Sequence, residues 1–108
     1  MSAPDVIEDR RTILLALAED ARRQAAEAAA DIETLKSQLV GDASADANAE
    51  YQAALDRLAA AHETRVEVEA ALERLATGSY GVCQVCGDQI PAERLDLRPQ
   101  TPTCVGCS

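Results

Sequence analysis

Apolar residues in the first forty positions of the chain repeat at a helical spacing. They recur at steps of three and four residues, at Leu14, Leu17, Ala21, Ala25, Ala28, Ile32, Leu35 and Leu39. Such steps place side chains on one face of an α-helix, where they form a seam that packs against another helix. The pattern therefore predicts one long helix that begins near Asp5 and ends before Gly41.

A second helical pattern follows a short polar segment. Residues 41–49 contain no large apolar side chain, and their Gly, Asp, Ser and Asn residues favour turns and helix caps. From Asn48 or Ala49 to Ala76 a second seam is expected, with the members Tyr51, Leu55, Leu58, His62, Val68, Leu72 and Leu75. A short connection makes two long helices antiparallel neighbours. We therefore predict an antiparallel coiled-coil hairpin over residues 1–78, with its tip at about 40–49.

The last thirty residues contain two Cys-x2-Cys pairs that are separated by seventeen residues. The cysteines are Cys83, Cys86, Cys104 and Cys107. A two-residue gap lets a tight turn bring both thiolates to one side of a metal ion, and the spacing falls within the zinc pattern. Four protein ligands leave no open coordination position, so we expect one structural zinc ion rather than a catalytic one.

A redox role for the Cys-x2-Cys pairs is the alternative interpretation. A thioredoxin-like pair requires a βαβ context, which the sequence does not predict, and it leaves the second pair unexplained. The segment also has few apolar residues, so metal binding must supply much of its stability. The predicted fold class is therefore all-α with a small zinc-binding module, in which the helical hairpin precedes a C4 zinc finger over residues 79–108.

Composition and charge narrow the range of partners. The 108 residues include 10 Lys and Arg against 19 Asp and Glu, a net charge of -9. Because Lys and Arg drive nucleic-acid binding, this balance disfavours direct contact with DNA or RNA and favours a protein partner with a basic site. No apolar stretch approaches the ~20 residues of a membrane span. The N-terminal residues lack the apolar run of a signal peptide, so we expect a cytoplasmic protein without membrane contact.

The cysteine-containing segment resembles the DksA/TraR C4-type zinc-finger family over residues 78–107. The resemblance rests on the segments YGVCQVCG at 80–87, IPAERL at 90–95, RP at 98–99 and CVGC at 104–107. Over residues 5–77 it is architectural only. The resemblance implies a non-enzymatic regulator that binds bacterial RNA polymerase, inserts its hairpin into the secondary channel and changes promoter output.

The resemblance also implies roles for four further residues. Asp46 matches an aspartate of the family's hairpin tip, and Asp42 is a displaced candidate for the other one. The family motif is Asp-x-x-Asp-x-Ala, whereas these aspartates are four residues apart and Asn48 replaces the alanine. Arg94 and Arg98 are candidates for contact with the polymerase or with the alarmone ppGpp.

Glu67 is the main reason to expect a weak or absent ppGpp response. Counted back from Cys83 without gaps, Glu67 falls where responsive members of the family have a basic residue. An acidic side chain there would repel a polyphosphate.

A second function class remains open. A non-enzymatic scaffold or interaction protein, in which the coiled coil binds another helix or a second copy, has the same helical pattern. The regulator interpretation predicts a monomer whose tip aspartates affect transcription, whereas a scaffold is indifferent to their replacement. A zinc-ribbon nucleic-acid binder and an enzyme are less well supported, the first because of the acidic charge.

Overall fold

Two long helices and one short helix make up most of the described chain. The computed structural model describes residues 3–41 and 44–107, with α1 at Ala3–Gly41, α2 at Ala45–Thr77, α3 at Ala92–Leu97 and a 3-10 turn at Val105–Cys107. Within these ranges the β-structure is limited to an isolated bridge between Val82 and Gln89. The predicted all-α class with a cysteine-containing module is confirmed. None of the described helices combines the length and the apolar character that a membrane span requires.

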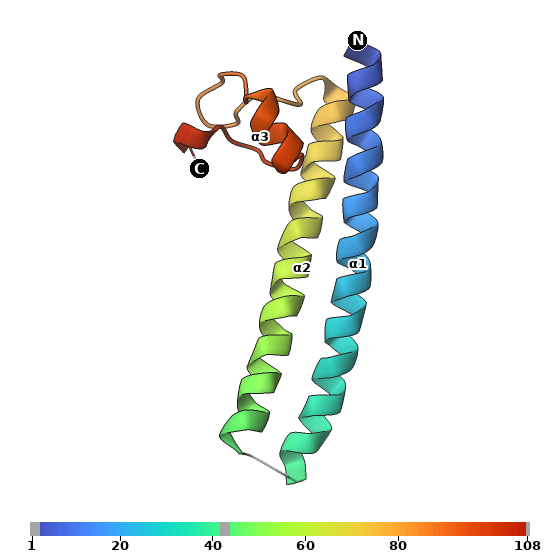
Figure 1. Ribbon diagram of the computed structural model, residues 1–108, viewed down its shortest axis with the longest axis vertical. Coiled ribbons are helices and arrows are strands. Elements are labelled where there is room, and N and C mark those ends of the chain that lie inside the picture. Colours follow the sequence, from blue (N-terminus) through green and yellow to red (C-terminus); the bar gives the residue numbers. More distant parts are fainter. Residues whose placement is uncertain (1–2, 42–43, 108) are drawn as a thin grey trace. The chain divides into compact units, whose positions relative to one another are not determined.

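Contacts divide the chain into two compact units. Met1–Ala18 with Val66–Ser108 form the first, here called the cysteine unit, and Glu19–Arg65 form the second, here called the hairpin unit. Within each unit the α1 and α2 segments lie side by side and run in opposite directions (Figure 1). The antiparallel pairing that the short connection predicted is therefore present in both units.

Alanine forms the core of the hairpin unit. Its buried apolar side chains are Ala21 and Ala28 from α1 and Ala54 and Ala61 from α2, and each pair is seven residues apart. A heptad of small residues lets two helices approach closely, but a methyl group buries little apolar area. Larger side chains such as Leu35 and Leu58 lie beside this seam and are only half-buried.

The seam of the second helix differs from the one that its large residues predicted. His62 is exposed, and the adjacent Ala61 occupies the buried position. A repeat of seven residues connects Ala54 and Ala61 to the buried Val68 and Leu75. The prediction was wrong at His62 because it favoured larger side chains over alanine, although alanine fits the closest approach of two helices.

The second helix also begins earlier than predicted. It starts at Ala45 rather than Asn48 or Ala49. The Ser44 hydroxyl accepts a hydrogen bond from the backbone N–H of Ala47 at 3.2 Å, as a helix N-cap does. The alternating alanines that follow are strong helix formers, so the cap starts the helix within the segment that had been interpreted as a turn.

Tyr80 connects the two apolar clusters of the cysteine unit. One cluster contains Leu14, Val68, Ala71 and Leu75, and the other contains Cys83, Ile90 and Leu95. The Tyr80 ring packs against both clusters, and its hydroxyl donates to the carbonyl oxygen of Pro99 at 2.8 Å. Burial raises the pKa of Tyr80, which keeps this donor protonated near neutral pH. The cysteine segment therefore packs on the ends of α1 and α2 that belong to the same unit.

Candidate metal centre

The four cysteine sulfurs converge on one point in the cysteine unit. All four Sγ atoms lie within 4.8 Å of one another. The distance between the Sγ atoms of Cys86 and Cys104 is 3.7 Å. This is far longer than a disulfide bond, and it matches the separation of about 3.8 Å between two sulfurs of a tetrahedron with Zn–S bonds of about 2.3 Å. The donor set and its spacing fit one zinc ion.

Backbone hydrogen bonds shape the first Cys-x2-Cys turn around its sulfur atoms. The Cys83 N–H donates to Asp88 O at 2.8 Å, and the Gly87 N–H donates to Cys83 O at 3.0 Å. The Cys86 N–H points at Cys83 Sγ at 3.5 Å. Gly87 has a φ of 80°, a left-handed conformation that glycine adopts without a steric cost. The sequence therefore forms a turn in which an amide donates to a ligand sulfur.

The second turn is held against the first by the main chain. The Cys107 N–H donates to Cys104 O at 3.1 Å and closes the turn. The Gln84 N–H, in the first turn, donates to Pro102 O at 2.9 Å. Two Cys-x2-Cys pairs, with seventeen residues between them in the sequence, are thus brought together by short hydrogen bonds close to the ligands.

The metal-free thiols of this cluster differ in acidity. The backbone N–H groups of Cys86 and then Cys104 lower the pKa of Cys83 to about 6. Hydrogen bonds with the Cys104, Cys86 and Cys83 sulfurs raise the pKa of Cys107 to about 12. Near neutral pH one thiolate is therefore stabilised, while Cys107 keeps its proton. Zinc binds thiolates, so metal loading must release the remaining protons.

Zinc affinity is expected to fall steeply as the pH is lowered. The pKa of Cys86 is also raised: the backbone at Asp88 lowers it, but hydrogen bonding with the Cys83 thiol, followed by burial, outweighs that effect. Zinc must then displace at least two protons near pH 7, so the apparent Kd should rise at least about a hundredfold for each pH unit that the pH is lowered from 8 to 6. Competition with a chromophoric chelator measures this, and an affinity that is constant over that window contradicts it.

Arginine side chains hold the segments that carry the ligands. Arg94 Nε donates to Thr103 O at 2.9 Å, directly before Cys104. The sequence singled out Arg94 as a polymerase or alarmone contact, and that role remains a prediction. The structure adds that Arg94, half-buried, positions the second Cys-x2-Cys turn.

Two further arginines in the helices were not identified from the sequence. Arg10 of α1 donates to Leu95 O at 3.1 Å and pairs with Asp96 at 2.7 Å, and its side chain is only 14% exposed. Arg74 of α2 lies within 3.5 Å of the carbonyl oxygens of Gln100 and Thr101. Burial lowers the pKa of Arg74, and the two carbonyl oxygens accept hydrogen bonds from its buried guanidinium. No sequence pattern indicates these contacts, because the partners are 26 to 86 residues apart.

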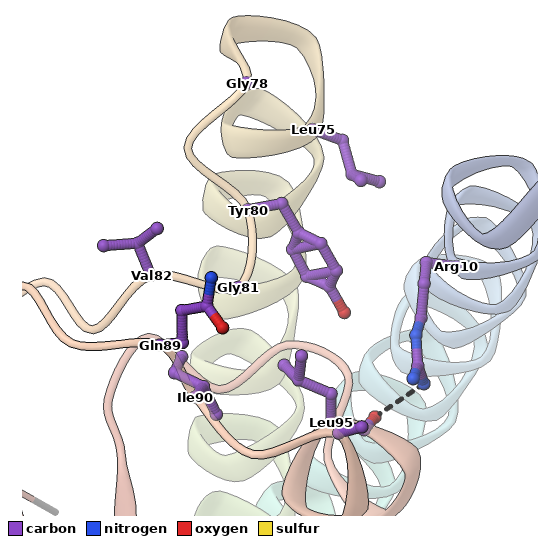
Figure 2. A pocket seen from close by; sticks show the side chains of 10 residues that line it. Arg10, Leu75, Gly78, Tyr80, Gly81, Val82, Gln89, Ile90 and Leu95 are labelled. Atoms are coloured by element: carbon purple, nitrogen blue, oxygen red, sulfur yellow. Dashed lines mark hydrogen bonds between the residues drawn. The ribbon is translucent and has the colours of Figure 1, made fainter. Parts of the chain in front are cut away.

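A pocket of about 490 Å³ lies between these elements of the cysteine unit. Figure 2 shows Tyr80 and Leu95 on its walls, with Arg10 directed at the Leu95 carbonyl oxygen. Among the described residues that line the pocket, Arg10 is the one that carries a charge, and most of the others are aliphatic or glycine. Because the Arg10 guanidinium already pairs with Asp96, the pocket extends the apolar packing around Tyr80 rather than forming a charged site.

Arg98 and Glu67 form an ion pair within the cysteine unit. Arg98 Nη2 lies 3.4 Å from Glu67 Oε2, and the two side chains are 54% and 26% exposed. The family resemblance connects both positions with alarmone binding. Arg98 is a candidate contact, whereas Glu67 stands where responsive members of the family have a basic residue. The structure brings them together, so the charge of Arg98 is balanced by a residue of α2.

Of the two predicted tip residues, the structure describes Asp46, which belongs to the hairpin unit. Asp46 is exposed in the first turn of α2, and its carboxylate makes no hydrogen bond to any residue that the structure describes. Since Ser44 provides the N-cap, Asp46 is not needed for that purpose. Asp42 lies outside the described residues.

Together, these features define a class of protein: a helical hairpin followed by a four-cysteine module that holds one structural zinc ion. Residues 78–107 match the family of the prokaryotic dksA/traR C4-type zinc finger. The four-cysteine module therefore matches the DksA/TraR zinc-finger family, and the resemblance is confirmed over these residues.

Two known proteins extend the comparison. The structure of transcription factor DksA2 from Pseudomonas aeruginosa superposes with a TM-score of 0.77 and 26% sequence identity, over 94% of this chain and 78% of that one. An uncharacterized protein of Aquifex aeolicus (strain VF5) is 43% identical over 42 residues. That match covers 39% of this chain and 29% of the Aquifex protein, so the chain spans less than a third of that relative. The similarity to DksA2 covers both helices as well as the zinc finger.

Proposed function

We propose that this protein is a bacterial transcription regulator that binds RNA polymerase at the secondary channel and directs its hairpin tip toward the active site. The observation that carries the proposal is the similarity to a transcription factor over 94% of the chain, together with the zinc finger at residues 78–107. The hairpin over 1–78 and the zinc finger over 79–108 are its two functional parts. The protein acts as a cytoplasmic monomer, without enzymatic activity, direct nucleic-acid contact or membrane contact.

The charge of the hairpin unit supports a basic protein surface as its partner. Residues 19–65 contain ten acidic and five basic residues, a net charge of -5. Four of the basic residues form ion pairs with acids of the same unit, namely Arg22, Arg23, Lys36 and Arg57. Cations that are already paired are poor phosphate ligands, whereas the unpaired acids attract a positively charged surface.

The tip supports an action on the partner beyond binding. Asp46 presents an exposed carboxylate at the start of α2 and is not needed as a cap. We propose that Asp46, with Asp42, acts inside the channel, while Arg94 and Arg98 contact the polymerase. Gel filtration with core RNA polymerase tests the binding: co-elution at micromolar concentration is expected, and separate elution would contradict it.

We propose further that the response to ppGpp is weak or absent. The Glu67 carboxylate pairs with Arg98 and would repel a polyphosphate at that position. To bind Arg98, ppGpp must therefore break this ion pair and lie next to the negative charge of Glu67.

Glu67→Lys is expected to create alarmone sensitivity. The change releases Arg98 and replaces the repelling charge with an attracting one, so ppGpp affinity of the polymerase complex should rise at least about tenfold. Calorimetric titration measures this, with Glu73→Lys as the control, since Glu73 is an exposed acid of the same helix. Tight ppGpp binding by the unaltered complex, lost on Arg98→Ala, would overturn the proposal.

A further inference from the structure

A hollow of about 400 Å³ opens on the surface of the hairpin unit, between its two helices. Successive turns of both helices line it. The lining includes Asp31, Leu35 and Gln38 of α1 and Glu50, Ala53 and Arg57 of α2. Residues three, four and seven apart lie on the same face of a helix, so each helix contributes one face to the lining. Because both faces line the same hollow, they lie opposite each other. Ala53 contributes only a methyl group to the lining, on the side of the hollow that α2 forms.

The lining of the hollow combines apolar side chains, here called its floor, with charged side chains, here called its rim. Leu35 and Ala53 supply the apolar part. Asp31 and Glu50 carry two negative charges, and Arg57 carries one positive charge, so the lining has a net charge of -1. Arg57 lies 3.0 Å from Asp31, and both side chains are more than half exposed. An ion pair between two exposed side chains is only weakly stabilising, so it is readily exchanged for another partner.

We propose that this hollow receives a lysine or arginine side chain of the protein partner. One positive charge neutralises the lining. The aliphatic stem of such a side chain packs on Leu35 and Ala53, while its cationic head reaches the carboxylate of Glu50. This inference rests on the proposed function, because the partner is the polymerase. It places a docking contact along the hairpin itself, separate from the tip aspartates and the zinc finger.

Other occupants fit the hollow less well. An anion would meet the net negative lining, and a fully apolar side chain would desolvate the carboxylates at its rim. A second copy of the chain would bring its own hairpin unit, which carries the same net charge of -5. Like charges disfavour pairing of two such faces. A basic side chain complements both parts of the lining, because its aliphatic stem suits the floor and its cationic head suits the rim.

Two substitutions test the contributions of the floor and of the rim separately. Ala53→Leu fills the hollow without changing charge, and Glu50→Gln removes the negative charge with little change in shape. The matched controls are Ala60→Leu, an exposed alanine one heptad further along α2, and Glu63→Gln, an exposed acid of α2 that does not line the hollow. All four positions are exposed, so helical content measured by circular dichroism should stay unchanged.

Affinity for core RNA polymerase, measured by titration at low and at moderate salt, tests the proposal. Ala53→Leu and Glu50→Gln should each weaken binding about three- to tenfold, and Glu50→Gln should also reduce the salt dependence. Both controls should stay within about twofold of the unaltered protein. If the hollow variants bind as the controls do, the hollow is not a docking site, although the polymerase remains the partner. If the unaltered protein does not bind, the proposed function fails and the inference with it.

Discussion

Cys104→Ser is expected to unfold residues 79–107 and to abolish stoichiometric zinc binding. The segment has a small core, in which Cys83, Ile90 and Leu95 are the buried members. Structural zinc contributes on the order of 10–16 kcal/mol to the folding of such modules, far more than this apolar cluster can supply. Because Tyr80 packs against both clusters, the adjoining ends of α1 and α2 should also lose stability.

The measurement combines metal analysis with limited proteolysis. The unaltered protein should contain close to one zinc ion per chain and resist cleavage after residue 78, and both properties should be lost in the variant. Val105→Ser is the matched control, because it alters the same turn at an exposed position that is not a ligand. A zinc-free protein whose residues 79–107 stay folded would contradict the structural role of the metal.

Asp46→Asn is expected to leave polymerase binding intact and to remove most of the effect on transcription. The carboxylate is exposed and the helix cap belongs to Ser44, so the substitution should cost little stability. It removes one negative charge from the part of the hairpin proposed to enter the channel. A contact with a charged group contributes about 1.5–3 kcal/mol, so at a saturating concentration of the protein the effect on transcription should fall at least about tenfold.

In vitro transcription from a promoter with a short-lived open complex measures this effect, with binding followed in parallel. Asp56→Asn, which removes the charge of another exposed aspartate of α2, is the control and should behave as the unaltered protein does. An unchanged transcription effect for Asp46→Asn would favour a scaffold over a channel regulator.

The metal ligands and the helices were predictable because their determinants are local in sequence. A Cys-x2-Cys pair closes within one turn, and steps of three and four residues fix the face of a helix. The cap at Ser44 was also local, but a segment rich in Asp, Ser and Asn supports either a turn or a helix start. The helix propensity of the alanines that follow Ser44 decides between them, and the prediction gave it less weight than the turn-forming residues.

The remaining features depend on tertiary packing. Alanine occurs on exposed and buried faces alike, so sequence alone did not distinguish the buried Ala61 from the exposed Ala60. The contacts of Arg10 with Asp96 and of Glu67 with Arg98 join residues that are 86 and 31 positions apart. Each side chain has many possible partners before folding, and the fold selects one.

Competition for the secondary channel tests the central claim most directly. Core RNA polymerase is immobilised, the purified zinc-loaded protein is bound, and a known secondary-channel binder is added at increasing concentration. The account predicts that the protein binds and is displaced in proportion to occupancy of the channel. Binding that persists with the channel fully occupied would contradict the proposed location. An absence of binding by folded, zinc-loaded protein would contradict the polymerase as partner and make the scaffold the better interpretation.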